Sequence, residues 1–190
     1  MDSGTILSPS SIETDSTWSI IIERSVNGGK CWQSIPVCSD DSIKIIQPTL
    51  LSFPDNSVQA LIRSDRNYIV QSWSVDDGIT WSTPTTTNML NPNSGIDAVT
   101  LKSGLQVLVY NPMKKGTKWY MGRNKLNVAI SRDGLEWEDV VILENHEKDE
   151  FSYPAIIEGE DGSIHITYTF NRTNIKYVNL EILNGEKNLR

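Results

Sequence analysis

Three carboxylates, Glu13, Asp97 and Glu150, stand where the sequence could place acid–base chemistry. Each lies near the inferred first strand of a repeated unit. Two carboxyl groups can act as general acid and general base in a glycosidase, or in a polysaccharide lyase. The alternative interpretation is that these residues are solvated or turn carboxylates, as most surface carboxylates are.

Histidine and cysteine do not form a recognisable catalytic or metal-binding pattern. His165 lies within a strand-like run and His146 lies in the acidic loop 144–150, and neither has a serine or cysteine at a motif spacing. The loop lacks the alternating ligands and central glycine of a calcium loop. Cys31 and Cys38 have no nearby histidine, which favours two reduced thiols. We therefore expect neither a metal nor a cofactor.

The composition is that of an ordinary globular chain. Of 190 residues, 38% are hydrophobic and 22% are charged, and 17 basic against 24 acidic side chains give a net charge of −7. The basic residues are dispersed, so nucleic acid is not an expected partner. No apolar run approaches the length of a membrane span, and residues 1–4 do not begin a signal peptide, which predicts a soluble chain with no membrane partner. The compartment stays open.

A polar turn that ends in tryptophan occurs three times, at 25–32, 74–81 and 131–137. We call these segments the Trp turns. Asp or Asn can bond the following backbone, glycine supplies positive φ, and the tryptophan can fill the space beneath, so each turn should fasten a hairpin. The repeated residues are Ser25, Asn27, Trp32, Ser74, Asp76, Gly78, Trp81, Ser131, Asp133 and Trp137. Self-similarity at about fifty residues is typical of propeller blades or solenoids.

Short strand-like runs fall into groups around the Trp turns. The complete groups are 45–53, 58–63, 67–74 and 81–86, and then 95–101, 105–110, 126–131 and 137–143. The incomplete groups are a leading hairpin, 18–23 and 31–37, and a trailing piece, 153–158, 163–170 and 174–180. Four-stranded units without an amphipathic helix favour a β-propeller over a sandwich.

The prediction is therefore an all-β chain of about three to three and a half blades of four antiparallel strands, forming one partial propeller domain over 1–190. The blade pieces are about 1–38, 45–88, 94–144 and 152–182, followed by a polar tail at 183–190. Because propellers close with about four to eight blades, we expect a truncated product, a fragment, or a half-propeller that a second chain completes. Open sheet edges would make such a monomer poorly soluble.

The Trp turns resemble the Asp-box, or BNR, repeats of sialidases and related six-bladed propellers. The second turn matches fully, the first has Asn27 in the Asp place, and the third is one residue shorter. The segments 47–51, 91–97 and 151–156 also resemble the sialidase-like BNR branch. The resemblance implies the C-terminal half of a six-bladed sialidase-type propeller. In that family the boxes lie on the outer rim, so they imply structure and not catalysis.

The resemblance also implies a site for an anionic sugar. Sialidases hold the substrate carboxylate with three arginines, whose planar forks suit a carboxylate. Arg63 resembles the second of these arginines and Arg123 the third, while the first would lie upstream of Met1. Each could instead be an exposed rim residue.

Tyr153 stands at the place of the sialidase nucleophile, and Gln47 stands where the family has the glutamate that activates it. A phenol that titrates near ten needs a neighbouring base, and an amide cannot accept its proton. The family's acid/base aspartate would lie upstream as well. The chain as given should therefore be inactive as a sialidase. Tyr153 could instead be an aromatic residue packed near the axis.

Three functional hypotheses remain. The first is a sialidase-like, carbohydrate-active propeller whose full-length relatives hydrolyse a glycosidic bond in a central pocket. The second is a noncatalytic carbohydrate-binding or interaction propeller, which Gln47 favours. The third is another glycosidase or a polysaccharide lyase that uses Glu13 or Asp97.

Overall fold

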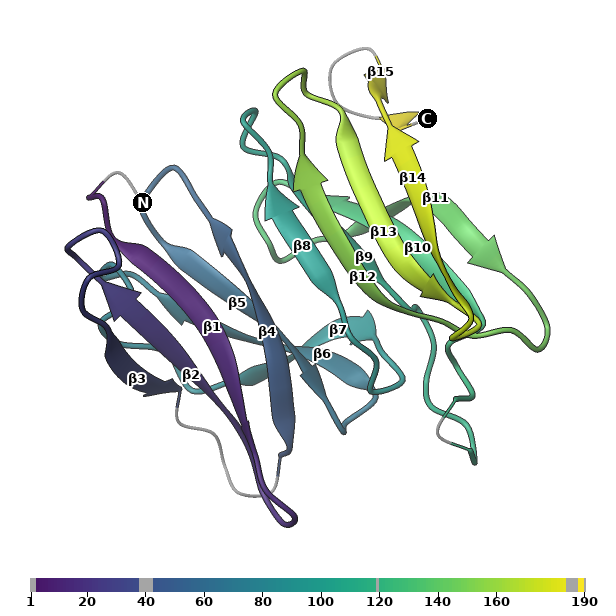
Figure 1. Ribbon diagram of the computed structural model, residues 1–190, viewed down its shortest axis with the longest axis horizontal. Coiled ribbons are helices and arrows are strands. Elements are labelled where there is room, and N and C mark those ends of the chain that lie inside the picture. The colour runs from purple at the N-terminus through teal and green to yellow at the C-terminus, as the bar shows by residue number, and fades with distance from the viewer. Residues whose placement is uncertain (1–2, 38–42, 119, 184–187, 190) are drawn as a thin grey trace.

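A computed structural model of the chain describes residues 3–37, 43–118, 120–183 and 188–189, and Figure 1 shows that these residues form a series of β-sheets. The first sheet contains β1 (Ile6–Glu13), β2 (Trp18–Ser25) and β3 (Gln33–Val37). The second contains β4 (Ile45–Ser52), β5 (Val58–Ser64), β6 (Tyr68–Ser74) and β7 (Thr85–Leu90). Within the described ranges, no helix is long and apolar enough to cross a bilayer.

The third and fourth sheets follow the same sequential antiparallel order. The third contains β8 (Asp97–Thr100), β9 (Gln106–Tyr110), β10 (Lys125–Ser131) and β11 (Glu138–Asn145). The fourth contains β12 (Phe151–Glu158), β13 (Ile164–Phe170) and β14 (Asn174–Leu180), and β15 (Ile182–Leu183) pairs separately with β16 (Asn188–Leu189). Two four-stranded sheets between two three-stranded sheets confirm the expected all-β architecture of about three to three and a half antiparallel blades.

The opening region differs from its prediction as a single hairpin. Ile6–Glu13 adds a strand, β1, which pairs along its whole length with β2. The sequence hid this strand because Ser8, Pro9, Ser10 and Ser11 interrupt the apolar alternation. Proline is tolerated in a strand at the edge of a sheet, and β1 is such an edge. Glu13 therefore ends a strand, whereas the sequence placed it before one.

The fourth strand of the second sheet also lies further along the chain than predicted. The sequence suggested 81–86, but β7 begins at Thr85. Trp81 belongs to the Trp turn itself, because its Nε1 donates to the carbonyl oxygen of Gly78 at 3.3 Å. The tryptophan thus closes the turn. Ser82 makes one backbone hydrogen bond to Trp73, and β7 begins after Pro84, which has no backbone N–H to donate.

The Trp turns share one hydrogen-bond pattern. In the second turn, Ser74 Oγ donates to Asp76 Oδ1 at 2.9 Å and accepts from the Gly78 backbone N–H at 3.0 Å. Asp76 Oδ1 also accepts from the backbone N–H of Thr80 at 2.8 Å. These hydrogen bonds, with that of the Thr80 hydroxyl foremost, lower the pKa of Asp76. The first and third turns repeat these contacts: serine donates to the side-chain oxygen of Asn27 or Asp133, and tryptophan donates to a glycine carbonyl.

Each Trp turn after the first docks on the preceding sheet through its glycine. Gly78 has a φ of 79° and packs so closely on Leu7 of β1 that an added Cβ would lie 2.6 Å from Leu7 Cδ2. Gly134 has a φ of 73° and accepts from Gln59 Nε2 of β5 at 2.8 Å. Only glycine meets both the positive φ and the close approach. The turns therefore join neighbouring sheets as well as neighbouring strands.

The strand register shows which place β1 occupies in its sheet. The serine that begins each Trp turn pairs with the first residue of the preceding strand, and the pairs are Ile6 with Ser25, Val58 with Ser74, and Gln106 with Ser131. By this register β1 corresponds to β5 and β9, which are second strands. It contacts β4, the first strand of the next sheet, and β4, β8 and β12 follow one another in contact.

The core is apolar between the sheets, and among the residues whose burial is described its one buried carboxylate is Glu144, which contacts the fourth sheet. Its side chain is 5% exposed and accepts from Tyr168 Oη at 2.6 Å and Lys176 Nζ at 2.5 Å. His146 Nε2 lies 2.9 Å from the same carboxylate. Burial alone would raise the pKa of Glu144, but the hydrogen bonds from Lys176 and Tyr168 outweigh it and the pKa is lowered.

This lowered pKa predicts a loss of stability in acid. A carboxyl group whose pKa is lower in the folded chain contributes stability above its unfolded pKa, and that contribution is lost as pH falls through the folded pKa. We expect the melting temperature to decrease once the pH is lowered below about 4.3, the ordinary pKa of a glutamate side chain. Glu144→Gln should lower the melting temperature at pH 7 and flatten this acid limb. An unchanged acid limb in the variant would contradict the assignment, and thermal unfolding followed by circular dichroism measures it.

Candidate functional site

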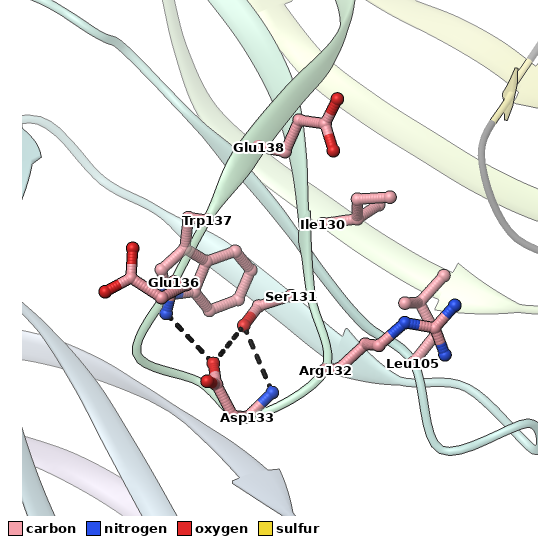
Figure 2. A pocket seen from close by; sticks show the side chains of 8 residues that line it. All are labelled: Leu105, Ile130, Ser131, Arg132, Asp133, Glu136, Trp137 and Glu138. Atoms are coloured by element: carbon pink, nitrogen blue, oxygen red, sulfur yellow. Dashed lines mark hydrogen bonds between the residues drawn. The ribbon is translucent and has the colours of Figure 1, made fainter.

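A hollow of about 340 Å³ lies beside the third Trp turn and is lined by Leu105, Ile130 and Arg132, among others. Figure 2 shows Ser131 and Asp133 of this turn joined by dashed hydrogen bonds, with Trp137 beside them. Asp133 Oδ1 accepts from the backbone N–H groups of Leu135 and Glu136 at 2.8 and 2.9 Å. The Asp133 carboxylate thus stabilises the turn. The hollow beside it is formed by a structural turn and is the weaker candidate for a binding site.

The stronger candidate site lies where β5 ends and β12 begins, and its centre is Arg63. This side chain is 8% exposed, and its Nε donates to Asn93 Oδ1 at 2.7 Å while Nη1 donates to Gln47 Oε1 at 2.8 Å. Burial lowers its pKa, and the nearby charge of Arg123 lowers it further. The Tyr153 hydroxyl and the charge of Glu13 act in the opposite direction. A buried cation held by neutral amides can bind an anion.

Arg123 is the second buried guanidinium of this site and is 5% exposed. Its Nη2 donates to the backbone oxygen of Asn93 at 3.0 Å, and its Nη1 lies 3.3 Å from Glu150 Oε1. Asn93 thus contacts both arginines, with its side chain on Arg63 and its carbonyl on Arg123. Its φ of 59° turns the chain so that both groups face this region.

Glu150 connects Arg123 to a third arginine, Arg172. Arg172 Nε donates to both carboxylate oxygens of Glu150, at 3.1 and 3.0 Å. The Glu150 backbone N–H donates to Asn171 Oδ1 at 2.8 Å, which holds the turn between β13 and β14 against this loop. Glu150 is therefore an ion-pair partner inside the site, and this arrangement does not leave it as an independent general acid.

Tyr153 is the exposed aromatic residue of the site, with 47% of its surface accessible. It lines an open cleft of about 470 Å³ together with Thr169 and Arg172, among others. It lies near enough to Arg63 to raise the pKa of that arginine, against the larger lowering by burial. The phenol therefore lies between the buried arginine and solvent, where a bound molecule could contact both.

Gln47 and Tyr153 share an unusual backbone conformation. Their φ values are 52° and 51°, each precedes a proline, and each lies at a break in the pairing register of its strand. Non-glycine residues seldom adopt this region. Between them lies Gly95, where an added Cβ would be 3.2 Å from Tyr153 Cδ1 and 3.7 Å from Gln47 Oε1. The bulges and the glycine therefore bring these two side chains into one small region.

The other carboxylates predicted from sequence have different surroundings. Asp97 accepts from Thr49 Oγ1 at 2.9 Å through one oxygen and from the Ile156 backbone N–H at 2.9 Å through the other. From its position in β8, Asp97 thus hydrogen-bonds to both β4 and β12, so its role is structural. Glu13, at the end of β1, is exposed and lies near enough to Arg63 to affect its pKa. Of the two, Glu13 is the one whose charge acts on Arg63.

Neither histidine forms a triad. His165 Nε2 lies 2.9 Å from Ser163 Oγ, a pairing that the sequence did not suggest, but Asp161 accepts from Ser163 and not from the histidine. Asp55 and Ser57 repeat the same aspartate–serine contact in the second sheet at the same 2.6 Å. The contact is therefore a feature of the repeated turn. Cys31 is a free, exposed thiol, and Cys38 lies outside the described residues.

Sequence reasoning missed Asn93, Arg172 and the role of Glu150 as an ion-pair partner. Asn93 lies in a segment that was noted only for its resemblance, 91–97, and an Asn-Pro-Asn loop before a strand is a signal for a turn. Arg172 gives no signal, because its contact with Glu150 depends on how the fourth sheet folds over the preceding loop.

A match to a known family covers residues 1–166, and its description is BNR repeat-like domain. No curated protein sequence matches the chain. The leech intramolecular trans-sialidase, solved with 2,7-anhydro-Neu5Ac, is 15% identical with a TM-score of 0.71 and covers 93% of this chain. A Trypanosoma rangeli sialidase mutant that displays trans-sialidase activity is 18% identical with a TM-score of 0.71 and covers 94%. The intramolecular trans-sialidase of Ruminococcus gnavus, solved with oseltamivir carboxylate, is 16% identical with a TM-score of 0.70 and also covers 94%.

These findings confirm an all-β fold of the sialidase-propeller type. The chain belongs to the BNR repeat-like domain family. It spans 29% of the leech and trypanosomal chains and 41% of the Ruminococcus chain. At these identities the structural likeness establishes the fold, and the chemistry depends on the arginine site itself.

Proposed function

We propose that the chain binds a carboxylated sugar through Arg63 and Arg123 and does not hydrolyse it. The observation that carries the proposal is the 2.8 Å hydrogen bond from Arg63 Nη1 to Gln47 Oε1. Gln47 stands where the resemblance implies a glutamate base, and here its amide oxygen is an acceptor for the arginine. An amide neutralises no positive charge, so Arg63 keeps its full attraction for an anion.

The ligand class follows from the chemistry of the site and from the fold relatives. Two nearly buried guanidinium groups favour a planar, bidentate anion such as a carboxylate over a neutral sugar. Three structures that share the fold are named sialidases or trans-sialidases, and one of them contains 2,7-anhydro-Neu5Ac. A sugar acid of this kind combines the carboxylate with hydroxyl groups that could contact Tyr153.

Calorimetric titration with N-acetylneuraminic acid and with its methyl ester tests the proposal. We expect the acid to bind at least about 10-fold more tightly than the ester, because esterification removes one charge-assisted interaction of about 1.5–3 kcal/mol. The difference should shrink at high salt, since part of it is electrostatic. Equal affinities for acid and ester, or the absence of binding by either, would overturn the proposal.

Gln47→Glu should weaken binding of the acid at neutral pH. The introduced carboxyl group would lie beside Arg63, so its pKa should be lower than that of an ordinary glutamate, and it should be ionised at pH 7. It would then neutralise Arg63 and repel the ligand carboxylate, with an expected loss of about 10-fold. Acidification through the lowered pKa should restore binding relative to pH 7. Titrations at about pH 3, well below the ordinary glutamate pKa of about 4.3, and at pH 7 measure this, with the unaltered chain at both pH values as the reference. A pH-independent loss would contradict it.

Hydrolysis by Tyr153 is the second candidate function. The exposure of this phenol and its nearness to the Arg63 guanidinium favour it. A fluorogenic sialoside at mildly acidic pH provides the assay. Turnover by the unaltered chain that disappears in Tyr153→Phe would establish this function in place of pure binding. Turnover that survives the substitution would exclude the tyrosine mechanism.

A further inference from the structure

Arg172 occupies a backbone position that a long side chain seldom takes. It follows Asn171 in the turn between β13 and β14, and the two residues have φ values of 54° and 51°. The turn closes with a hydrogen bond from the Thr173 backbone N–H to the Phe170 oxygen at 3.1 Å. Consecutive positive φ values define a type I′ turn, in which the second central position favours glycine. An arginine there directs a long cationic side chain back across the sheet to Glu150.

Glu150 holds this guanidinium in the same cluster as the two buried arginines. The carboxylate is 12% exposed, and it lies 3.0 Å from Arg172 Nε and 3.3 Å from Arg123 Nη1. Arg63, Arg123 and Arg172 carry three positive charges, and Glu150 and Glu13 carry two negative charges. The cluster thus keeps a net positive charge on a chain whose net charge is −7. This excess marks the cluster as a place for an anion.

Arg172 also faces the cleft that Tyr153 lines. Its side chain is 49% exposed, whereas the side chain of Arg123 is 6% exposed. The cleft brings Arg172 together with the exposed phenol of Tyr153 and with Thr169. A molecule that contacts Arg63 and the Tyr153 hydroxyl would therefore have the Arg172 guanidinium on its other side.

We propose that Arg172 is a ligand-binding residue, the third guanidinium of the anion site, and that the fourth sheet supplies it. It binds the carboxylate of the same sugar acid from the Tyr153 side, while Arg63 and Arg123 bind it from the buried side. This inference rests on the proposed function. The resemblance made Arg63 and Arg123 the counterparts of the family's second and third arginines and matched the first to no residue of this chain, whereas Arg172 comes from the fourth sheet.

The test is a comparison of acid and ester affinities in Arg172→Gln. For the unaltered chain the affinity ratio between N-acetylneuraminic acid and its methyl ester reports how strongly the site senses the carboxylate. A direct contact predicts that Arg172→Gln lowers acid affinity about 10-fold and ester affinity much less, so the ratio falls. The affinity ratio of Arg172→Lys should lie between those of the unaltered chain and Arg172→Gln, because lysine keeps the charge but lacks the planar guanidinium. Arg66→Gln, a change at a half-exposed arginine of the β5–β6 turn, is the matched control and should leave the ratio unchanged.

The outcomes separate this inference from the proposed function. If the unaltered chain shows no preference for the acid, the proposed function fails. If Arg63→Gln lowers the ratio and Arg172→Gln does not, the proposed function stands and the inference about Arg172 is wrong. A purely structural role for Arg172 would weaken acid and ester binding equally. Melting temperatures of all variants check that each is folded under the titration conditions.

Discussion

Arg63→Gln should reduce the affinity for N-acetylneuraminic acid about 10- to 100-fold. The substitution removes a cation that is 8% exposed, and charge-assisted hydrogen bonds from such a group contribute about 1.5–3 kcal/mol each. It also leaves Asn93 Oδ1 and Gln47 Oε1 without the donor that now orients them. The loss should therefore include positioning as well as charge. Calorimetric titration at low and moderate salt measures it.

Two comparisons sharpen this prediction. Arg63→Lys keeps the charge but cannot donate to Asn93 and Gln47 with the same fork, so it should recover only part of the affinity. Arg66→Gln removes an arginine on the turn after β5, where the side chain is 44% exposed, and should leave binding unchanged. Undiminished binding by a folded Arg63→Gln variant would show that this arginine does not face the ligand.

Phe151→Ala should destabilise the chain by about 3–5 kcal/mol, the usual cost of removing a large buried aromatic side chain. Phe151 is 0% exposed, and its ring lies 5.1 Å from Phe170 and 5.0 Å from His146, centroid to centroid. Its backbone N–H donates to the Arg123 oxygen at 2.8 Å. The residue therefore packs the start of β12 against the loop that carries Arg123. At about 2–4 °C per kcal/mol, the melting temperature should fall by roughly 10 °C.

Val75→Ala is the control for Phe151→Ala, because Val75 is 83% exposed at the tip of a Trp turn and should change stability by less than about 0.5 kcal/mol. The folded fraction of Phe151→Ala should still prefer the sugar acid to its ester, since the guanidinium groups remain. A shift in melting temperature as small as that of Val75→Ala would contradict the buried packing of Phe151.

The sequence contained the parts of the site that repeat. Gln47 and Tyr153 each lie near the start of a predicted blade piece, and the structure gives them matching φ values and register breaks. Their roles, with those of Arg63 and Arg123, remain proposals. A repeat can be detected along the chain because its physical basis, turn chemistry and strand alternation, is local.

Contacts between distant segments could not be predicted in this way. Asp97 looked as available as Glu13, yet its two oxygens bond β4 and β12, which depends on how three first strands pack. Glu150 was considered as an acid or base, and its pairing with Arg172 across the fourth sheet gives it another task. The edge strand β1 was missed because proline and serine hide its alternation, although it pairs with β2 along its whole length.

Gly78 packs on Leu7 of the first sheet, and Gly134 packs on Gln59 of the second. Each of these turns therefore stabilises the contact between its own sheet and the preceding sheet. Stability in a row of such sheets is the sum of the units and of the contacts between adjacent units. A bulky residue in place of Gly134 should therefore loosen the junction between the second and third sheets and leave the junction at Gly78 unaffected. Hydrogen exchange would then show faster exchange of backbone amides in the second and third sheets and unchanged exchange at the junction that contains Gly78.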